Sequence, residues 1–158
     1  MEKMIVSRLK WFLEYYKLLD MSQSCFKKRR TTDHILRLHD TVQKFLANRH
    51  HVRAIFIDLE KAYDVVSHQV LLFKLVQMGI NGRMFNFINS FLSSRTFQMR
   101  LASSLSTTKT LENGIPQATV LSPILFTIAV NHLPKSISSP SALYADDCCF
   151  WESGSNID

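Results

Sequence analysis

Three aspartates stand where a carboxylate metal site could form. Asp58 ends an apolar run of β-forming residues, and Asp146 and Asp147 are adjacent between two short apolar runs. Three carboxylates on neighbouring strands can hold two Mg²⁺ ions, which prefer oxygen ligands, and such a pair of ions promotes phosphoryl transfer. The alternative is a solvent-exposed Asp-Asp turn, because aspartate favours turns through its local hydrogen bonds.

Two other carboxylate chemistries fit these residues less well. A metal-dependent strand nuclease would carry an acid, one residue and then a lysine, whereas Asp58 is followed by Leu59, Glu60 and Lys61. A phosphoacceptor receiver domain would have its acidic pair early in the chain and a lysine late, but here the acidic pair comes last.

Hydrophobic patterning places the three aspartates on strands. The run 52–57 is almost wholly apolar, which predicts a core strand with Asp58 at its C-terminal end. The runs 142–145 and 148–151 flank the acidic pair, a pattern typical of a tight β-hairpin with two acids at its tip.

Apolar residues at helical spacing predict the elements around these strands. Residues 5–19 have the pattern of an amphipathic helix, and a second helix should occupy 31–46, where its first three residues offer N-caps. A third helix should be capped by Ser67 and end at Gly79.

A buried helix is predicted late in the chain. Three weaker elements precede it, a short helix and two short strands: 85–91, 97–101 and 107–111. Ser122 should then act as N-cap and Pro123 as first helical residue of an apolar helix at 124–133, which Pro134 stops.

The charge of the chain is concentrated in its first third. The net charge is +6, but residues 1–53 hold 12 Lys and Arg against 5 Asp and Glu, a net +7, whereas residues 54–158 hold 7 against 8, a net −1. Such a field attracts a polyanion, because cations that neutralise phosphates release condensed counterions. A solvated basic face is the alternative.

Composition excludes several protein classes. With 46% hydrophobic and 20% charged residues among 158, the chain is neither disordered nor fibrous. Cys25, Cys148 and Cys149 are too few and badly spaced for a disulfide framework, which predicts a reducing, intracellular compartment. We expect no membrane association, because the longest apolar stretch, 124–130, is far shorter than the roughly 20 residues that a bilayer requires.

Four segments in order resemble a known family. They read FIDLEKAYD at 56–64, GIPQATVLSPILF at 114–126, YADD at 144–147 and, ahead of these, QSCFKKRRTTDH at 23–34. The first three are similar to palm motifs of reverse transcriptases, and the fourth is similar to the fingers segment of non-LTR retrotransposon enzymes. The resemblance extends over essentially the whole chain.

The resemblance implies an α+β fold and a polymerase activity. Residues 1–51 would form a basic, helical part of the fingers, and residues 52–158 a palm whose antiparallel sheet is backed by helices; the thumb is expected to be missing. The activity would be RNA-directed DNA synthesis, with an RNA or DNA template, a primer and deoxynucleoside triphosphates as partners.

The resemblance also implies roles for single residues. Asp58, Asp146 and Asp147 would be the catalytic ligands of two Mg²⁺ ions, for which Mn²⁺ can substitute. Tyr63 would exclude a ribose 2′-hydroxyl, and Gln117 would contact the incoming nucleotide. Its phosphates would be clamped by the basic cluster, which contains Lys28, Arg29 and Arg30.

Some residues depart from the family pattern. Ala118 stands where glycine usually follows Pro-Gln, and Cys25 and Arg29 also replace common glycines, positions at which positive φ or close approach to a ligand is typical. A catalytically silent domain that binds nucleic acid through residues 1–53 is therefore the alternative function. Lys61 and Asp64 have the spacing of a surface ion pair.

Overall fold

The chain folds into two compact units. The structure is a computed structural model that describes residues 2–23, 31–93 and 95–155. One unit comprises Met1–Ser7 and Lys61–Ala129, and the other comprises Arg8–Glu60 and Val130–Asp158. Helices and antiparallel sheets occur together, which confirms the α+β class.

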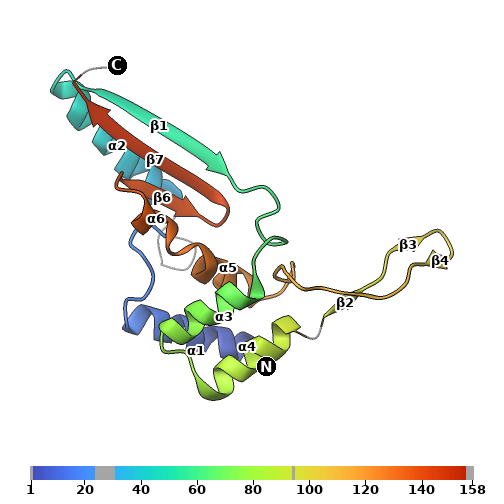
Figure 1. Ribbon diagram of the computed structural model, residues 1–158. Coiled ribbons are helices and arrows are strands. Elements are labelled where there is room, and N and C mark those ends of the chain that lie inside the picture. The colour runs from blue at the N-terminus through green and yellow to red at the C-terminus, as the bar shows by residue number, and fades with distance from the viewer. Residues whose placement is uncertain (1, 24–30, 94, 156–158) are drawn as a thin grey trace. The chain divides into compact units, whose positions relative to one another are not determined.

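A three-stranded antiparallel sheet organises the second unit (Figure 1). Its order is β1 (His51–Asp58), β7 (Asp147–Gly154) and β6 (Ser141–Tyr144), so the predicted strand and hairpin are both present. The turn of the hairpin is one residue earlier than predicted, because Tyr144 pairs with Asp147 and leaves Ala145 and Asp146 as the two loop residues.

The prediction that β1 is a core strand was wrong. β1 lies at the edge of the sheet, and its side chains are mostly exposed, with Ile55 at 63% and Phe56 at 73%. Apolar composition indicates a strand that can bury both faces, but it does not reveal which element covers each face.

The core of the second unit lies on the β6–β7 hairpin. Leu143, Cys148 and Phe150 are buried, and three partly buried residues pack against them: Leu59, Leu133 and Ile137. Asn131 is 5% exposed, and its side chain accepts from Asp20 N–H at 2.8 Å and donates to the Leu18 carbonyl at 3.0 Å. This amide joins the turn after the first helix to the segment before the hairpin.

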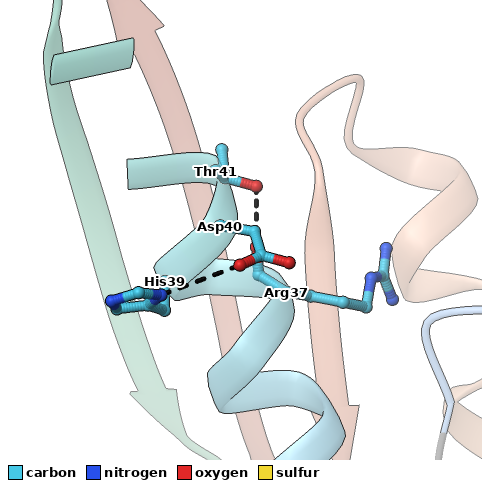
Figure 2. Close-up of polar contacts among 4 residues, drawn as sticks. All are labelled: Arg37, His39, Asp40 and Thr41. Carbon is cyan, nitrogen blue, oxygen red and sulfur yellow. Dashed lines mark hydrogen bonds and ion pairs between the residues drawn. The ribbon is translucent and has the colours of Figure 1, made fainter. Parts of the chain in front are cut away.

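Two helices precede the sheet in the sequence. α1 (Glu2–Tyr15) and α2 (Thr31–Ala47) agree with the first two predicted helices, and α2 contacts β1. Figure 2 shows polar contacts on α2: Thr41 Oγ1 donates to the Arg37 carbonyl at 2.8 Å, and His39 Nδ1 lies 3.7 Å from Asp40 Oδ1. The His39–Asp40 pair is exposed and therefore contributes little to stability.

The first unit contains a helical hairpin, α3 (His68–Gln77) and α4 (Gly82–Ser93), whose members contact each other. The Ser67 hydroxyl caps α3 as predicted, accepting from Val70 N–H at 3.4 Å. Gly79 follows the helix with a φ of 80°, a value that glycine adopts at little cost.

A two-stranded ribbon occupies the region where two weak strands were predicted. It consists of four short strands that pair as β2 with β5 and β3 with β4: Thr96–Phe97, Arg100–Leu101, Ser104–Leu105 and Lys109–Thr110. Between the two ladders, Met99 and Ser106 continue the pairing, since Ser106 N–H donates to the Met99 carbonyl at 2.9 Å. The two predicted strands therefore lie in the correct region, but each is divided into two shorter strands.

The buried helix is shorter than predicted. α5 (Ser122–Val130) buries its apolar residues almost completely, but α6 (Leu133–Ser136) is separate, and Pro134 lies in its first turn instead of stopping α5. Proline fits the first turn of a helix because its missing N–H would have no partner there. No helix in the part of the chain that the structure describes is long and apolar enough to cross a bilayer.

Candidate active site

The second unit brings Asp58 and Asp147 together. They are direct partners in the β1–β7 register, so their side chains leave the same face of the sheet. Cβ atoms of such cross-strand neighbours lie about 5 Å apart. Both residues are exposed, at the end of the sheet where β1 ends and β7 begins.

Asp146 occupies the turn beside this pair. The turn begins with Ala145 at a φ of 54°, the left-handed conformation that two-residue hairpin loops require at their first position. The Leu59 N–H donates to the Asp146 carbonyl at 3.3 Å, which ties the turn to the chain just after β1. The register thus gives Asp147, and not Asp146, the place opposite Asp58.

Three carboxylates of like charge lie at this end of the sheet. Among the described residues, no Lys, Arg or His forms an ion pair with Asp58, Asp146 or Asp147. Burial, and then the negative charges of Asp147 and Asp146, raise the pKa of the Cys148 thiol. No three His, Cys, Asp or Glu side chains in the described ranges are grouped to hold a metal ion.

An apolar pocket of about 390 Å³ adjoins the aspartate pair. Asp58, Asp147 and Tyr144 are among its lining residues on the sheet. α2 contributes the three lining residues that do not come from the sheet: His34, Ile35 and Leu38. The carboxylates therefore border an apolar surface, and Coulomb interactions are stronger beside such a surface than in bulk water.

Tyr63 belongs to the first unit, where its ring stacks on Phe126. The ring centroids are 4.7 Å apart and the planes differ by 21°. Tyr63 is half-buried, whereas Phe126 is 1% exposed. The stack fixes the orientation of the tyrosine ring against the buried helix α5.

The loop that precedes Gln117 is bonded to the segment around Tyr63. Gly114 N–H donates to the Val66 carbonyl at 2.8 Å, and Ile115 N–H donates to the Tyr63 carbonyl at 2.7 Å. The ring of His68 donates from Nε2 to the Gly114 carbonyl at 2.6 Å. These bonds position the loop without any contribution from its exposed side chains.

Gln117 is exposed, and its Nε2 donates to Asp64 Oδ1 at 3.2 Å. Asp64 was expected as a surface ion-pair partner of Lys61; in the structure its carboxylate accepts a hydrogen bond from Gln117, the predicted nucleotide contact. A pocket of about 230 Å³ adjoins Gln117, with Arg95 and Asn113 among its lining residues. Both residues lie outside the motifs that resemble the family, so the sequence did not point to them.

Ala118 adopts a φ of 60°, the left-handed conformation that its substitution for glycine predicted. A Cβ at this φ is strained, since it approaches the following carbonyl oxygen. The next turn begins α5 differently from the prediction. Ser122 N–H donates to Thr119 Oγ1 at 3.2 Å, and the Ser122 hydroxyl donates to the Pro116 carbonyl, so Thr119 provides the capping oxygen that was assigned to Ser122.

The basic cluster predicted to bind the nucleotide phosphates lies in a part of the chain that the structure does not describe. Lys28, Arg29, Arg30 and Cys25 lie outside the described residues. Their roles in phosphate binding therefore stay predictions.

The sequence profile described as "Reverse transcriptase (RNA-dependent DNA polymerase)" matches residues 1–156. The chain belongs to the reverse transcriptase family. Among its relatives are a probable RNA-directed DNA polymerase from transposon BS and one from transposon X-element, both of Drosophila melanogaster, at 27% and 28% identity. They match 92% and 94% of this chain, which spans 17% of the length of each.

Solved structures share the fold of this reverse transcriptase chain. A telomerase from Candida tropicalis, truncated from its C-terminal domain, superposes with a TM-score of 0.71 at 15% identity, covering 99% of this chain and 35% of the telomerase chain. A telomerase from Candida albicans, in complex with a fragment of telomeric RNA, superposes with a TM-score of 0.59 at 14% identity. The match covers 95% of this chain and 29% of that telomerase chain.

Gly114→Ala should destabilise the first unit. Gly114 has a φ of 91°, and a Cβ there would lie 2.9 Å from the Asp64 carbonyl oxygen. Strain and overlap together predict a loss of about 2–4 kcal/mol in the free energy of unfolding, measured by urea denaturation. Gly82→Ala is the matched control, because Gly82 has a φ of 62° with open space around it, so its loss should be smaller. Equal losses would mean that close packing at Gly114 is unimportant.

Ala118→Gly should stabilise the chain by up to about 1 kcal/mol. Glycine relieves the left-handed strain at φ 60°, although it also increases the conformational entropy of the unfolded chain. Ala129→Gly, inside α5, should instead lose about 1 kcal/mol, because glycine disfavours a helix. A destabilised Ala118→Gly variant would show that the strain at Ala118 is smaller than the entropy that glycine adds to the unfolded chain.

Proposed function

We propose that this chain carries the polymerase site of a retrotransposon reverse transcriptase and supports RNA-directed DNA synthesis. A primer 3′-hydroxyl attacks the α-phosphate of a deoxynucleoside triphosphate, a new phosphodiester bond forms, and pyrophosphate leaves. The observation that carries the proposal is the cross-strand pair of Asp58 and Asp147, with Asp146 in the adjoining turn. RNA or DNA is the template.

The three aspartates are not grouped around one point in the described structure, and the proposal is that a cation draws them together. Like charges directly opposite each other across a sheet are destabilising, and no cationic side chain of the described residues neutralises this pair. Asp58 and Asp147, together with Asp146, would hold two Mg²⁺ ions, or Mn²⁺ in their place. Such ions polarise phosphoryl oxygens and acidify the attacking hydroxyl.

The second unit supplies these ligands on a rigid base. Backbone pairing of β1 with β7 holds Asp58 and Asp147 in register. The buried face of β7, with Cys148 and Phe150, anchors the strand of Asp147 in the core. The three-stranded sheet corresponds in this proposal to the palm. Residues 1–51 correspond to part of the fingers, whose Lys28, Arg29 and Arg30 contact the triphosphate.

The first unit supplies nucleotide selection. The Tyr63 ring, fixed by its stack on Phe126, fills the volume that a ribose 2′-hydroxyl would need. Gln117, held toward Asp64 by a hydrogen bond, contacts the incoming nucleotide. Steric exclusion of the ribose 2′-hydroxyl requires a ring of fixed position, because a mobile ring could move aside for the larger sugar.

The second candidate function is nucleic-acid binding without catalysis. It is favoured by the strained Ala118 next to Gln117, and by the fact that no three His, Cys, Asp or Glu side chains of the described residues are grouped to hold a metal ion. The two functions differ in one measurement, since a silent domain would bind a primer–template but would not extend the primer.

Asp147→Asn should abolish both the Mg²⁺-induced rise in melting temperature and the Mg²⁺-dependent extension of a primer. In the unsubstituted chain Mg²⁺ should raise the melting temperature by binding the folded state, and a labelled primer on an RNA template should be extended. Asp147→Asn removes one ligand, so the metal-induced shift should vanish and extension should fall roughly 100-fold or more.

Asp40→Asn is the matched control, because Asp40 is an exposed carboxylate of α2 in the same unit. It should leave both readouts unchanged. Equal metal-induced shifts in all three proteins would reject the carboxylate site, and a normal metal shift without primer extension would favour the silent alternative.

Tyr63→Ala should relax sugar selection. Removing the ring should raise kcat/KM for ribonucleotides relative to deoxyribonucleotides by roughly tenfold or more, because rejection comes from a filled volume. Tyr63→Phe keeps the ring and its stack on Phe126, so discrimination should persist. If Tyr63→Ala lowers kcat/KM for both sugars equally, the ring serves packing alone.

A further inference from the structure

The end of α1 carries a cluster of aromatic rings that no motif accounts for. Trp11 and Tyr15 stack with centroids 5.0 Å apart and planes 21° apart. Tyr16 meets Tyr15 edge-on at 5.0 Å and 81°, and it meets Phe12 at 4.8 Å and 53°. All four residues lie in the second unit, and together they form what we call the α1 aromatic face.

The α1 aromatic face is turned to solvent. Trp11 is 61% exposed, Tyr15 65% and Tyr16 57%, whereas Leu9 and Leu13 on the opposite side of the helix are buried. Each ring of a stacked pair has one face toward its neighbour and one face away from it. The exposure of Trp11 and Tyr15 indicates that their outward faces are accessible. Contiguous exposed apolar surface of this kind usually marks an interaction site.

Cations flank the rings. Residues 8–17 contain Arg8, Lys10 and Lys17 against Glu14, a net charge of +2. Arg8 precedes Trp11 by three positions on the helix, so the two side chains leave neighbouring points of the same side. Lys17 follows the ring cluster directly and is exposed. The face therefore combines accessible π-surfaces with positive charge at both ends.

We propose that the α1 aromatic face binds single-stranded nucleic acid, with bases stacked on Trp11 and Tyr15 and phosphates contacted by Arg8 and Lys17. Stacking of bases on aromatic side chains in a positively charged surface is how proteins hold single strands without sequence preference. A duplex offers no such surface, because its bases already stack on one another. Trp, Tyr and Arg are also enriched at protein interfaces, whereas lysine is depleted there. The net positive charge around the rings therefore decides for a polyanion over a protein partner. The proposal locates a single-strand surface within residues 1–53, to which the second candidate function assigns nucleic-acid binding, and it does not rest on polymerisation.

Tryptophan fluorescence tests the proposal directly. The chain has two tryptophans, Trp11 at 61% and Trp151 at 3% exposure, so iodide should quench mainly Trp11. Oligothymidine and oligouridine single strands should quench Trp11 emission and protect it from iodide, whereas a duplex of the same length should do neither. Trp11→Phe should keep the affinity for a fluorescein-labelled single strand and lose the quenching signal.

Substitution gives the second readout. Trp11→Ala combined with Tyr15→Ala should weaken single-strand binding by about tenfold or more, because each stacked base contributes substantially. Phe73→Ala is the matched control, since Phe73 is a 62% exposed ring on α3 and should not affect binding. Unchanged affinity in the double variant, or Trp11 emission that does not respond to single strands, would overturn the proposal. Loss of self-association or protein binding at constant oligonucleotide affinity would assign the face to a protein partner instead.

Discussion

The antiparallel pairing of β1 with β7 is the constraint on which the carboxylate geometry depends. Side chains alternate across a strand, so a slip of one residue would move Asp58 to the face opposite Asp147. The ladder of β1 with β7 and the bond from Leu59 N–H to the Asp146 carbonyl hold this register, whereas the two-residue turn sets the register of β6 on β7. Because the carboxylates repel each other, their positions are fixed by the backbone and not by any attraction between them. Holding two like charges opposite each other in this way costs stability.

In the first unit, too, backbone conformation fixes the position of a candidate site residue. Gly114 bonds to Val66 at a φ that only glycine adopts easily, and Ala118 keeps a left-handed φ despite its Cβ. Such strain persists only where neighbouring bonds hold it, and here the hydroxyls of Thr119 and Ser122 hold the start of α5. The loop that carries Gln117 therefore has a defined conformation although Gln117 itself is exposed.

The sequence predicted the helices and strands of this fold better than it predicted which side chains are buried and which contacts they make. Local signals gave the Ser67 cap, the strand ending at Asp58 and the acidic hairpin, because capping, alternation and turn chemistry act over a few residues. It did not predict that Phe56 is exposed or that Thr119 caps α5, because these depend on contacts between segments far apart or on competing hydroxyls. The candidate aspartates came from the strand pattern and then from the motif resemblance, whereas the pairing of Asp58 with Asp147 depends on the register of β1 on β7, which no single segment encodes.

β1 shows how closely the site and the sheet depend on each other. Its exposed apolar residues gain little from burial, so within the described residues the strand is held mainly by its ladder to β7 and by contact with α2. Edge strands with apolar side chains are prone to pair elsewhere, and charged residues on the strand oppose this. Arg53 and Asp58 are the charged residues near its two ends. Asp58 thus belongs both to the candidate metal site and to the protection of the edge, so a substitution that neutralises it removes a charge from both.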